Sequence, residues 1–177
     1  MTALRGTSAM IFETNRLILR PRTMDDFDDC IVMDKAPGVV DFIPGPWERE
    51  REHRAFVRTR INAHYGDGLG YWSVFAKSAP NTFMGWVLLI PEDGVGPDVE
   101  IGWRLHPDYW GNGFASEAAL ALVPHAFETL NLPRIVAGID QRNHGSIGVA
   151  RKTGMTCRSK QDGYDVYVIE NPQRSDV

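Results

Sequence analysis

The sequence predicts an α/β (α+β) fold in which helices pack on a mixed, mostly antiparallel sheet. Its patterns follow one another as strand, helix, helix, three strands, helix, strand, helix and strands. Short turns separate the three central strands, which favours antiparallel pairing. A long helical pattern then joins the strand at 99–105 to the strand at 134–140, and such a crossover implies that these two strands are parallel neighbours.

The N-terminal third predicts one strand and two helices. An alternating apolar pattern over 11–21 indicates a strand that ends at a proline. Thr23 is a good N-cap, and the aspartates that follow it suit the first turn of a helix. After a Pro/Gly-rich loop at 37–47, a charged helix with apolar residues at four-residue spacing extends to about Tyr65.

The rest of the chain predicts five strands and two helices. A clean apolar stripe follows the glycines near residue 112 and indicates a helix to Leu130, in which Pro124 should remove one backbone hydrogen bond and cause a kink. Asn143 is a good N-cap for the last helix, which Gly154 can close. The strand patterns occupy 71–77, 82–90, 99–105, 134–140 and 164–170.

The chain of 177 residues suggests one domain with a substantial core. We find no repeat, low-complexity tract or linker in the sequence. The predicted organisation is a flexible N-terminal tail at 1–10, a single domain at 11–171 and a C-terminal tail at 172–177.

The composition argues against several classes of protein. A net charge of −4 and a pI of about 5.7 make a broad nucleic-acid surface unexpected. The five histidines and two cysteines show no metal-ligand spacing, so no metal site is expected. The N-terminus lacks the apolar core of a signal peptide, and no apolar run is long enough to span a bilayer. We therefore expect no membrane partner and a cytoplasmic location.

Two glycines, Gly111 and Gly113, separate a buried strand from the first turn of a helix. Such a turn can hold an anion on the free N–H groups of the helix, or it can be a tight connection without a ligand. A Walker A loop fits poorly, because Phe114 and Ala115 stand where Lys and Ser or Thr are needed. A dinucleotide fingerprint fits poorly too, because Ser116 replaces its third glycine and the motif comes late in the chain.

The run from Trp110 to Ala115 resembles the acyl-CoA pyrophosphate loop of the GNAT acetyltransferases, Arg/Gln-x-x-Gly-x-Gly/Ala. Trp at the first position departs from that pattern, but "YWGxGxAxEA" is common in the branch that includes the ribosomal-protein N-terminal acetyltransferases, and this chain reads "YWGNGFASEA". The segments "TNRLILRP" at 14–21 and "NHGSIGVARKTGM" at 143–155 are similar to two further segments of that branch. Residues 38–98 carry no diagnostic motif.

The resemblance implies a six- to seven-stranded sheet, about four flanking helices and a central strand pair that splays apart near Leu105 and Asp140. It also implies that acetyl-CoA is the co-substrate, with its pantetheine arm along one splayed strand and its pyrophosphate on the glycine turn. The residues so implicated in binding it are Trp103, Arg104, Leu105, Trp110, Gly111, Asn112, Gly113, Phe114, Ala115, Ser116 and Asn143.

The implied reaction is the attack of a neutral amine on a thioester. Deprotonation at pH 7 costs about 4–5 kcal/mol for a lysine amine and only about 1 kcal/mol for an α-amino group. Glu100, on an otherwise apolar strand, should have a raised pKa and is the candidate general base. The alternative is a structural glutamate that pairs with Arg104 on the same face.

The departing thiolate can take a hydrogen bond. Many GNAT enzymes use a Tyr seven residues after the Asn of the last motif, but here that position is Ala150. In the ribosomal-type branch a Ser three residues after the Asn serves instead, and Ser146 matches it. The alternative roles are a helix-start serine that bonds backbone, and for Asn143 a simple N-cap.

The acceptor would be a small-molecule amine or a peptide N-terminus. Its expected site includes Asp41, Trp47, Tyr71, Trp72 and Tyr167, although core packing is the alternative for each aromatic residue. Two other functions remain open: a catalytically silent acyl-CoA-binding module, which Ala150 favours, and a different nucleotide-binding domain. The protein is expected to be a monomer or a homodimer.

Overall fold

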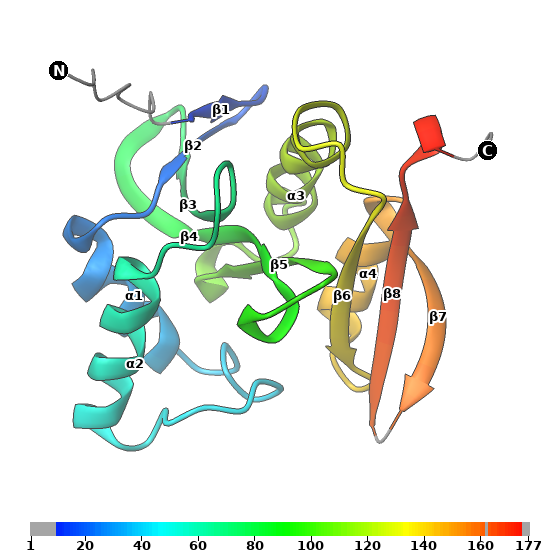
Figure 1. Cartoon of the computed structure of the whole chain (residues 1–177). Coiled ribbons are helices and arrows are strands. Elements are labelled where there is room, and N and C mark those ends of the chain that lie inside the picture. Colours follow the sequence, from blue (N-terminus) through cyan, green and yellow to red (C-terminus); the bar gives the residue numbers. More distant parts are fainter. Residues whose placement is uncertain (1–9, 162, 175–177) are drawn as a thin grey trace, which may run out of the picture.

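The computed structural model describes residues 10–161 and 163–174 (Figure 1). One sheet has the strand order β1-β2-β3-β4-β5-β6-β8-β7, and every neighbouring pair is antiparallel except β5 with β6. The strands are β1 (Phe12–Glu13), β2 (Leu17–Pro21), β3 (Gly70–Ala76), β4 (Ala79–Pro91), β5 (Val99–Leu105), β6 (Arg134–Asp140), β7 (Thr156–Gln161) and β8 (Tyr164–Glu170). The predicted mixed, mostly antiparallel sheet is therefore confirmed.

The sheet has eight strands rather than six or seven. The single strand expected over 11–21 is two strands, because the Thr14 hydroxyl accepts a hydrogen bond from the Leu17 N–H (2.9 Å) and turns the chain back on itself. Of the two tails predicted outside 11–171, residues 1–9 and 175–177 lie outside the described residues.

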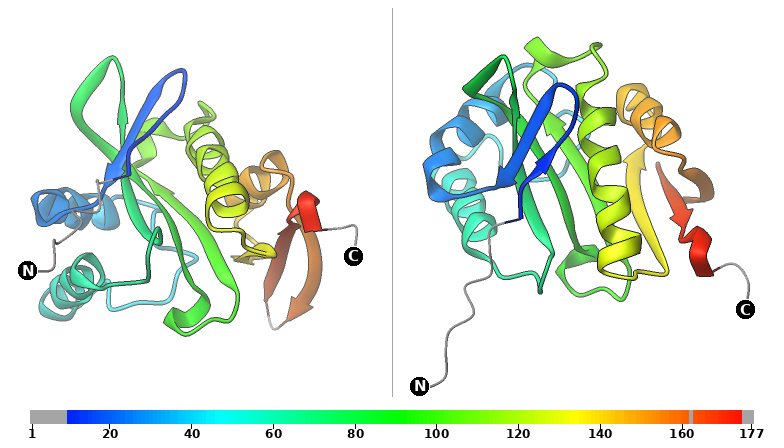
Figure 2. Two further views of the ribbon diagram at one scale, coloured as in Figure 1. Left: turned by 45° about the horizontal axis from the view of Figure 1, so that its top comes forward. Right: turned by 90° about the horizontal axis from the view of Figure 1, so that it is seen from above.

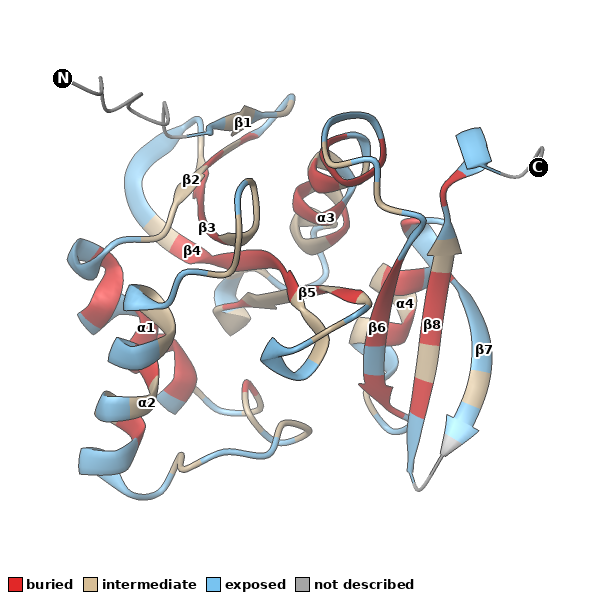
Figure 3. Cartoon of the chain, viewed as in Figure 1, coloured by how far each residue is buried: buried red, intermediate tan, exposed pale blue. Residues whose placement is uncertain are grey.

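The four expected helices are α1 (Phe27–Lys35), α2 (Glu50–Asn62), α3 (Phe114–Pro124) and α4 (His144–Lys152). Helices α1 and α2 lie on one side of the central strands, and α3 and α4 lie on the other (Figure 2). Alternate residues of β4 face the two sides, so Leu88 packs with α1 and α2 while Val87 packs with α3. The sheet thus separates two apolar cores, and its central strands are the most deeply buried part of the chain (Figure 3).

Short helical turns complete the fold. They are η1 (Met24–Asp26), η2 (Glu92–Gly94), η3 (Pro107–Tyr109), η4 (His125–Thr129) and η5 (Pro172–Arg174). The helix with the internal proline does not simply kink: α3 ends at Pro124 and continues as the π-helical turn η4, in which the Leu130 N–H donates to the His125 carbonyl (3.0 Å).

The predicted splayed pair is β5 with β6. Within these two fully described strands, parallel pairing is limited to Glu100 opposite Val136. Both strands then run on, to Leu105 and Asp140, without pairing to each other. The last residues of β5 and β6 therefore flank an opening at the centre of the sheet.

Candidate active site

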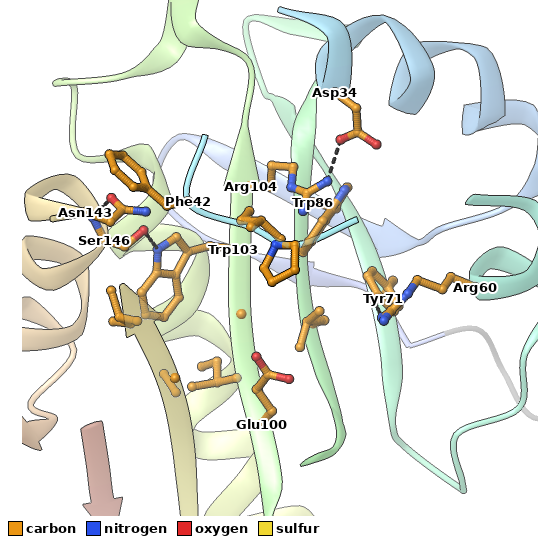
Figure 4. Close-up of a pocket in the computed structure, with 18 of the residues that line it drawn as sticks. Asp34, Phe42, Arg60, Tyr71, Trp86, Glu100, Trp103, Arg104, Asn143 and Ser146 are labelled. Atoms are coloured by element: carbon orange, nitrogen blue, oxygen red, sulfur yellow. Dashed lines mark hydrogen bonds and ion pairs between the residues drawn. The ribbon is translucent and has the colours of Figure 1, made fainter. Parts of the chain in front are cut away.

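Two cavities meet at this opening. The α3-side groove, of about 680 Å³, is lined by the end of β5, the glycine turn and the start of α4. The α2-side pocket, of about 430 Å³, lies on the opposite face of β5 (Figure 4). The residues that line both cavities are Phe42, Ile43, Trp103, Arg104, Asn143 and Ser146. The segment of residues 37–49, here called the 37–49 loop, contributes to both walls.

The glycine turn forms one end of the groove. Gly111 and Gly113 have φ of 76° and 78°, a left-handed conformation that side-chain-bearing residues rarely adopt, so the turn itself requires glycine. The first helical bond of α3 runs from the Glu117 N–H to the Gly113 carbonyl (3.0 Å). The N–H groups of the residues between them therefore have no acceptor within the helix and are free for an anion.

Trp110, at the position where the resemblance leads one to expect Arg or Gln, ties the turn to the sheet. Its indole N–H donates to the Leu105 carbonyl (2.8 Å), and its ring faces Gly38 of the 37–49 loop. The Asn112 side chain donates to the Trp110 carbonyl (2.9 Å) and lines neither cavity. The Asn112 side chain therefore stabilises the turn from within.

Two motifs of the resemblance, 14–21 and 109–118, are in direct contact. Arg16 donates through Nε to Glu117 (2.6 Å) and through Nη1 to the Asn112 carbonyl (3.1 Å), and the Thr14 hydroxyl donates to Glu117 (2.5 Å). Burial of Glu117 raises its pKa, but these hydrogen bonds outweigh burial and lower the pKa overall. The β1–β2 turn thereby fixes the start of α3, a contact that sequence analysis missed.

Ser146 stands at the junction of the two cavities. Its N–H donates to the Asn143 side chain (3.0 Å), so Asn143 is the N-cap of α4. Its hydroxyl accepts from the Trp103 indole N–H (3.2 Å). Because indole is a donor only, this bond uses a lone pair of Oγ and leaves the hydroxyl proton available to another acceptor.

Glu100 lines the α2-side pocket and faces away from Ile101 and the α3 side. Burial raises the pKa of its carboxyl; Arg60 opposes the shift, and Glu92 and Asp93 add to it. The alternative role, a structural pairing with Arg104, is not formed: Arg104 donates to Asp34 instead (2.6 Å).

Asp34 binds two partners and is 3% exposed. Besides Arg104, it contacts the Nε2 atom of His53 at 2.9 Å, and His53 is fully buried. The Arg104 guanidinium lies 5.0 Å from the centre of the Trp47 ring and 4.9 Å from that of Trp86. The side chain of Arg104 thus belongs to the α2-side pocket, and only its backbone is placed for the predicted cofactor contact.

The predicted acceptor residues separate into three groups. Trp47 and Tyr71 line the α2-side pocket, whereas Asp41 lines the groove. Trp72 and Tyr167 line neither cavity, because both are buried in the core on the α3 side. Neighbouring residues of a strand point to opposite faces, so Tyr71 in the pocket places Trp72 on the other side.

Gly148 offers a test of the groove. It lies within α4 and lines the groove, and a Cβ there would meet no atom within 4 Å. Gly148→Ala should stabilise the fold by about 0.5–1 kcal/mol through helix propensity. Its methyl group narrows the groove and should raise the Kd for acetyl-CoA, the co-substrate that the resemblance implies. Thermal unfolding and calorimetric titration measure the two effects, and an unchanged Kd would show that the ligand does not pass this face of α4.

The described part of the chain contains neither a candidate metal site nor a candidate membrane-spanning helix. Among residues 10–161 and 163–174, no three His, Cys, Asp or Glu side chains are grouped to hold a metal ion. None of the helices in these residues is long and apolar enough to cross a membrane.

Comparisons with known proteins agree on one family. Residues 16–156 match the acetyltransferase (GNAT) domain. N-acetyltransferase YnaD of Bacillus subtilis (strain 168) is 30% identical over 146 residues, which cover 82% of each chain. FsC-acetyl coenzyme A-N(2)-transacetylase of Aspergillus fumigatus is 33% identical over 152 residues, covering 81% of this chain and 63% of that protein.

Solved structures give the same answer. The acetyltransferase from Agrobacterium tumefaciens str. C58 superposes with a TM-score of 0.77 and 27% identity, covering 96% of this chain and 99% of that one. The ribosomal-protein-S5-alanine acetyltransferase from Vibrio fischeri has a TM-score of 0.73 and 16% identity, with 92% and 97% covered, and shares the fold. The chain therefore belongs to the GNAT family of acetyltransferases and is an acyltransferase enzyme.

Proposed function

We propose that the protein transfers an acetyl group from acetyl-CoA to a primary amine, by direct attack of the amine in a ternary complex. One observation carries the proposal: the groove and the pocket meet at Trp103 and Ser146, where β5 and β6 separate. Two substrates that enter from opposite faces of β5 would meet at this point. The carboxylate of Glu100 lies on the pocket side.

The α3-side groove would hold acetyl-CoA. The N–H groups of Gly113 to Ser116 would bind its pyrophosphate, supported by the positive end of the α3 dipole. The edge of β5 at Trp103 to Leu105 that does not pair with β6 would bind the pantetheine arm, with Asn143 close to it. The side chain of Arg104 would take no part, since it faces Asp34.

The amine would occupy the α2-side pocket. Its nitrogen forms a bond to the thioester carbonyl carbon, the carbon–sulfur bond breaks, and the electron pair leaves with the sulfur. Glu100 would take the amine proton, directly or through one water, because its raised pKa makes it a better base than an exposed glutamate. The Ser146 hydroxyl would donate a hydrogen bond to the leaving thiolate.

Ser146→Ala should slow acetyl transfer without abolishing it. A free thiol has a pKa near 8.5, so the thiolate can leave without being protonated. The loss should therefore be seen in kcat, while the KM for the amine stays close to that of the wild type. Steady-state kinetics measured by thiol release would test this. Thr153→Ser is the control variant, because the Thr153 hydroxyl donates to backbone carbonyls of α4. Complete inactivity of the Ser146 variant would instead make the hydroxyl an obligatory acid.

Calorimetric titration with acetyl-CoA tests the proposal most directly. Binding that requires both the pantetheine arm and the phosphates is expected, with dephosphorylated pantetheine and ADP each binding weakly. A panel of amines and peptides scored by thiol release would follow. Binding of acetyl-CoA without release of thiol by any amine would favour a silent acyl-CoA-binding module.

A further inference from the structure

Arg22 is a cationic side chain of the α2-side pocket that has no acidic partner in the described part of the chain. Its guanidinium lies 3.6 Å from the centre of the Tyr71 ring and 5.7 Å from that of Trp86. Its Nε and Nη2 atoms are buried and find no hydrogen-bond partner within residues 10–161 and 163–174. Among the described residues, Arg22 forms no salt bridge with any carboxylate.

The other charges around the pocket do not neutralise Arg22. Asp34 is paired with Arg104 and His53. The charge of Arg22 favours the thiolate form of Cys30 and lowers the pKa of this thiol. Burial outweighs that effect and raises the pKa to about 12, so the thiol is neutral. Neither Asp34 nor Cys30 therefore balances the positive charge that Arg22 brings to this wall of the pocket.

The pocket also has an acidic wall. Glu100 and Glu92 line it together with Asp93, and Glu92 and Asp93 act electrostatically on Glu100. Arg60 interacts with both walls: it donates to the hydroxyl of Tyr71, on whose ring Arg22 packs (2.8 Å), and its charge lowers the pKa of Glu100. One pocket thus presents a cationic wall, an acidic wall and aromatic surfaces.

Arg22 as a whole is half-buried, but its two buried nitrogens are in an unfavourable position, because their N–H groups have lost water without gaining acceptors. Its planar fork of donors matches a carboxylate or a phosphate. An anionic group on the acceptor would supply the missing acceptors, and the acidic wall would attract the acceptor's ammonium group before it loses its proton.

We propose that the acceptor is a small amine that also carries an oxyanion, a carboxylate or a phosphate, and that Arg22 binds this oxyanion. This inference rests on the proposed acetyl transfer and narrows its substrate class. A peptide N-terminus is disfavoured, because the group next to its amine is a neutral amide.

The first experiment compares matched pairs of amines with the full chain and acetyl-CoA. One arm pairs α- and ω-amino acids with their amides, a second pairs phosphoethanolamine with ethanolamine, and a tripeptide amide represents peptide N-termini. Rates of thiol release are expressed per neutral amine, using the pKa of each amine, so that its basicity does not bias the comparison. We expect kcat/KM to favour the anionic member of at least one pair by about tenfold or more, as one charge-assisted hydrogen bond would give. The pair that responds distinguishes a carboxylate from a phosphate.

The second experiment removes the cation. Arg22→Gln should reduce the preference for the anionic amine to about twofold or less, by loss of that charge-assisted bond, while the rate with its neutral partner stays unchanged. Arg22→Lys keeps the charge but loses the planar fork, so it should show an intermediate preference. Arg58→Gln is the matched control, because Arg58 is exposed on α2 and lines neither cavity.

The outcomes separate the two proposals. If neutral amines or the tripeptide amide are preferred by the wild-type protein, the oxyanion assignment is wrong and acetyl transfer stands. If Arg22→Gln slows both members of a pair equally, Arg22 has a structural role only. If no amine of any class releases thiol, acetyl transfer itself fails. The wild-type comparison decides the matter even where the Arg22 variants do not fold.

Discussion

Replacement of Glu100 by Gln is expected to lower kcat/KM for the amine by about 10²–10⁴-fold, the usual effect of a general base. The wild-type rate should rise with pH as Glu100 loses its proton. This acidic limb of the pH–rate profile should be absent from Glu100→Gln. A second rise in rate, caused by deprotonation of the amine substrate itself, should remain in the variant. The pH dependence of kcat/KM at saturating acetyl-CoA measures both limbs.

The same substitution should stabilise the fold. Because burial raises the pKa of Glu100 in the folded protein, the folded state binds more protons than the unfolded state between the two pKa values. Stability therefore falls as pH rises from the unfolded pKa towards the folded one, and that loss persists at neutral pH. Glu100→Gln should have the higher Tm at pH 7 and no advantage in acid, where the wild-type carboxyl is already neutral.

Glu92→Gln is the control for this assignment. Glu92 raises the pKa of Glu100 from the same acidic wall of the pocket, so its neutralisation should move the acidic limb of the rate profile to lower pH. The maximal rate should change little. An unshifted limb in Glu92→Gln, or a retained limb in Glu100→Gln, would assign the titration to another group.

Replacement of Asp34 by Asn is expected to cause the largest loss of stability, roughly 3–5 kcal/mol, because it leaves the Arg104 guanidinium buried without an anion. Asp34 and Arg104 are 3% and 9% exposed at their side chains. For a chain of this size the loss corresponds to a fall in Tm on the order of 10 °C. Chemical and thermal denaturation would measure it.

Removal of both charges distinguishes the free-energy cost of an unpaired buried charge from the cost of altered packing. The double variant Asp34→Asn/Arg104→Met should be more stable than Asp34→Asn, since no unpaired charge remains. Glu50→Gln is the matched surface control: its partner Lys35 and Glu50 itself are both exposed, and its Tm should equal that of the wild type. A double variant no more stable than Asp34→Asn would show that the aspartate acts by shape rather than by charge.

The motif-bearing part of the site could be predicted from the sequence. Gly111 and Gly113 lie at a turn whose geometry demands glycine, and Asn143 caps the helix that carries Ser146. These features are local, and a short stretch of sequence specifies them. The alternation of apolar residues in the neighbouring strands can be predicted for the same reason.

The α2-side pocket could not be predicted in this way. Asp34 and Arg104 are 70 residues apart, and His53 joins them from a third element. The role of Arg22 depends on the stacking of rings from β3 and β4 beneath it. Alternation does imply that Tyr71 and Trp72 cannot line the same pocket, but it does not tell which of them faces it.

The 37–49 loop lines both cavities, with Phe42 and Ile43 common to the two. Any rearrangement of this loop on acetyl-CoA binding changes the walls that the amine meets. The two binding free energies are then coupled, and the coupling is reciprocal: the factor by which acetyl-CoA changes the affinity for the amine equals the factor by which the amine changes the affinity for acetyl-CoA. Preference for one order of substrate addition would thus arise from a shared wall, with no separate regulatory site.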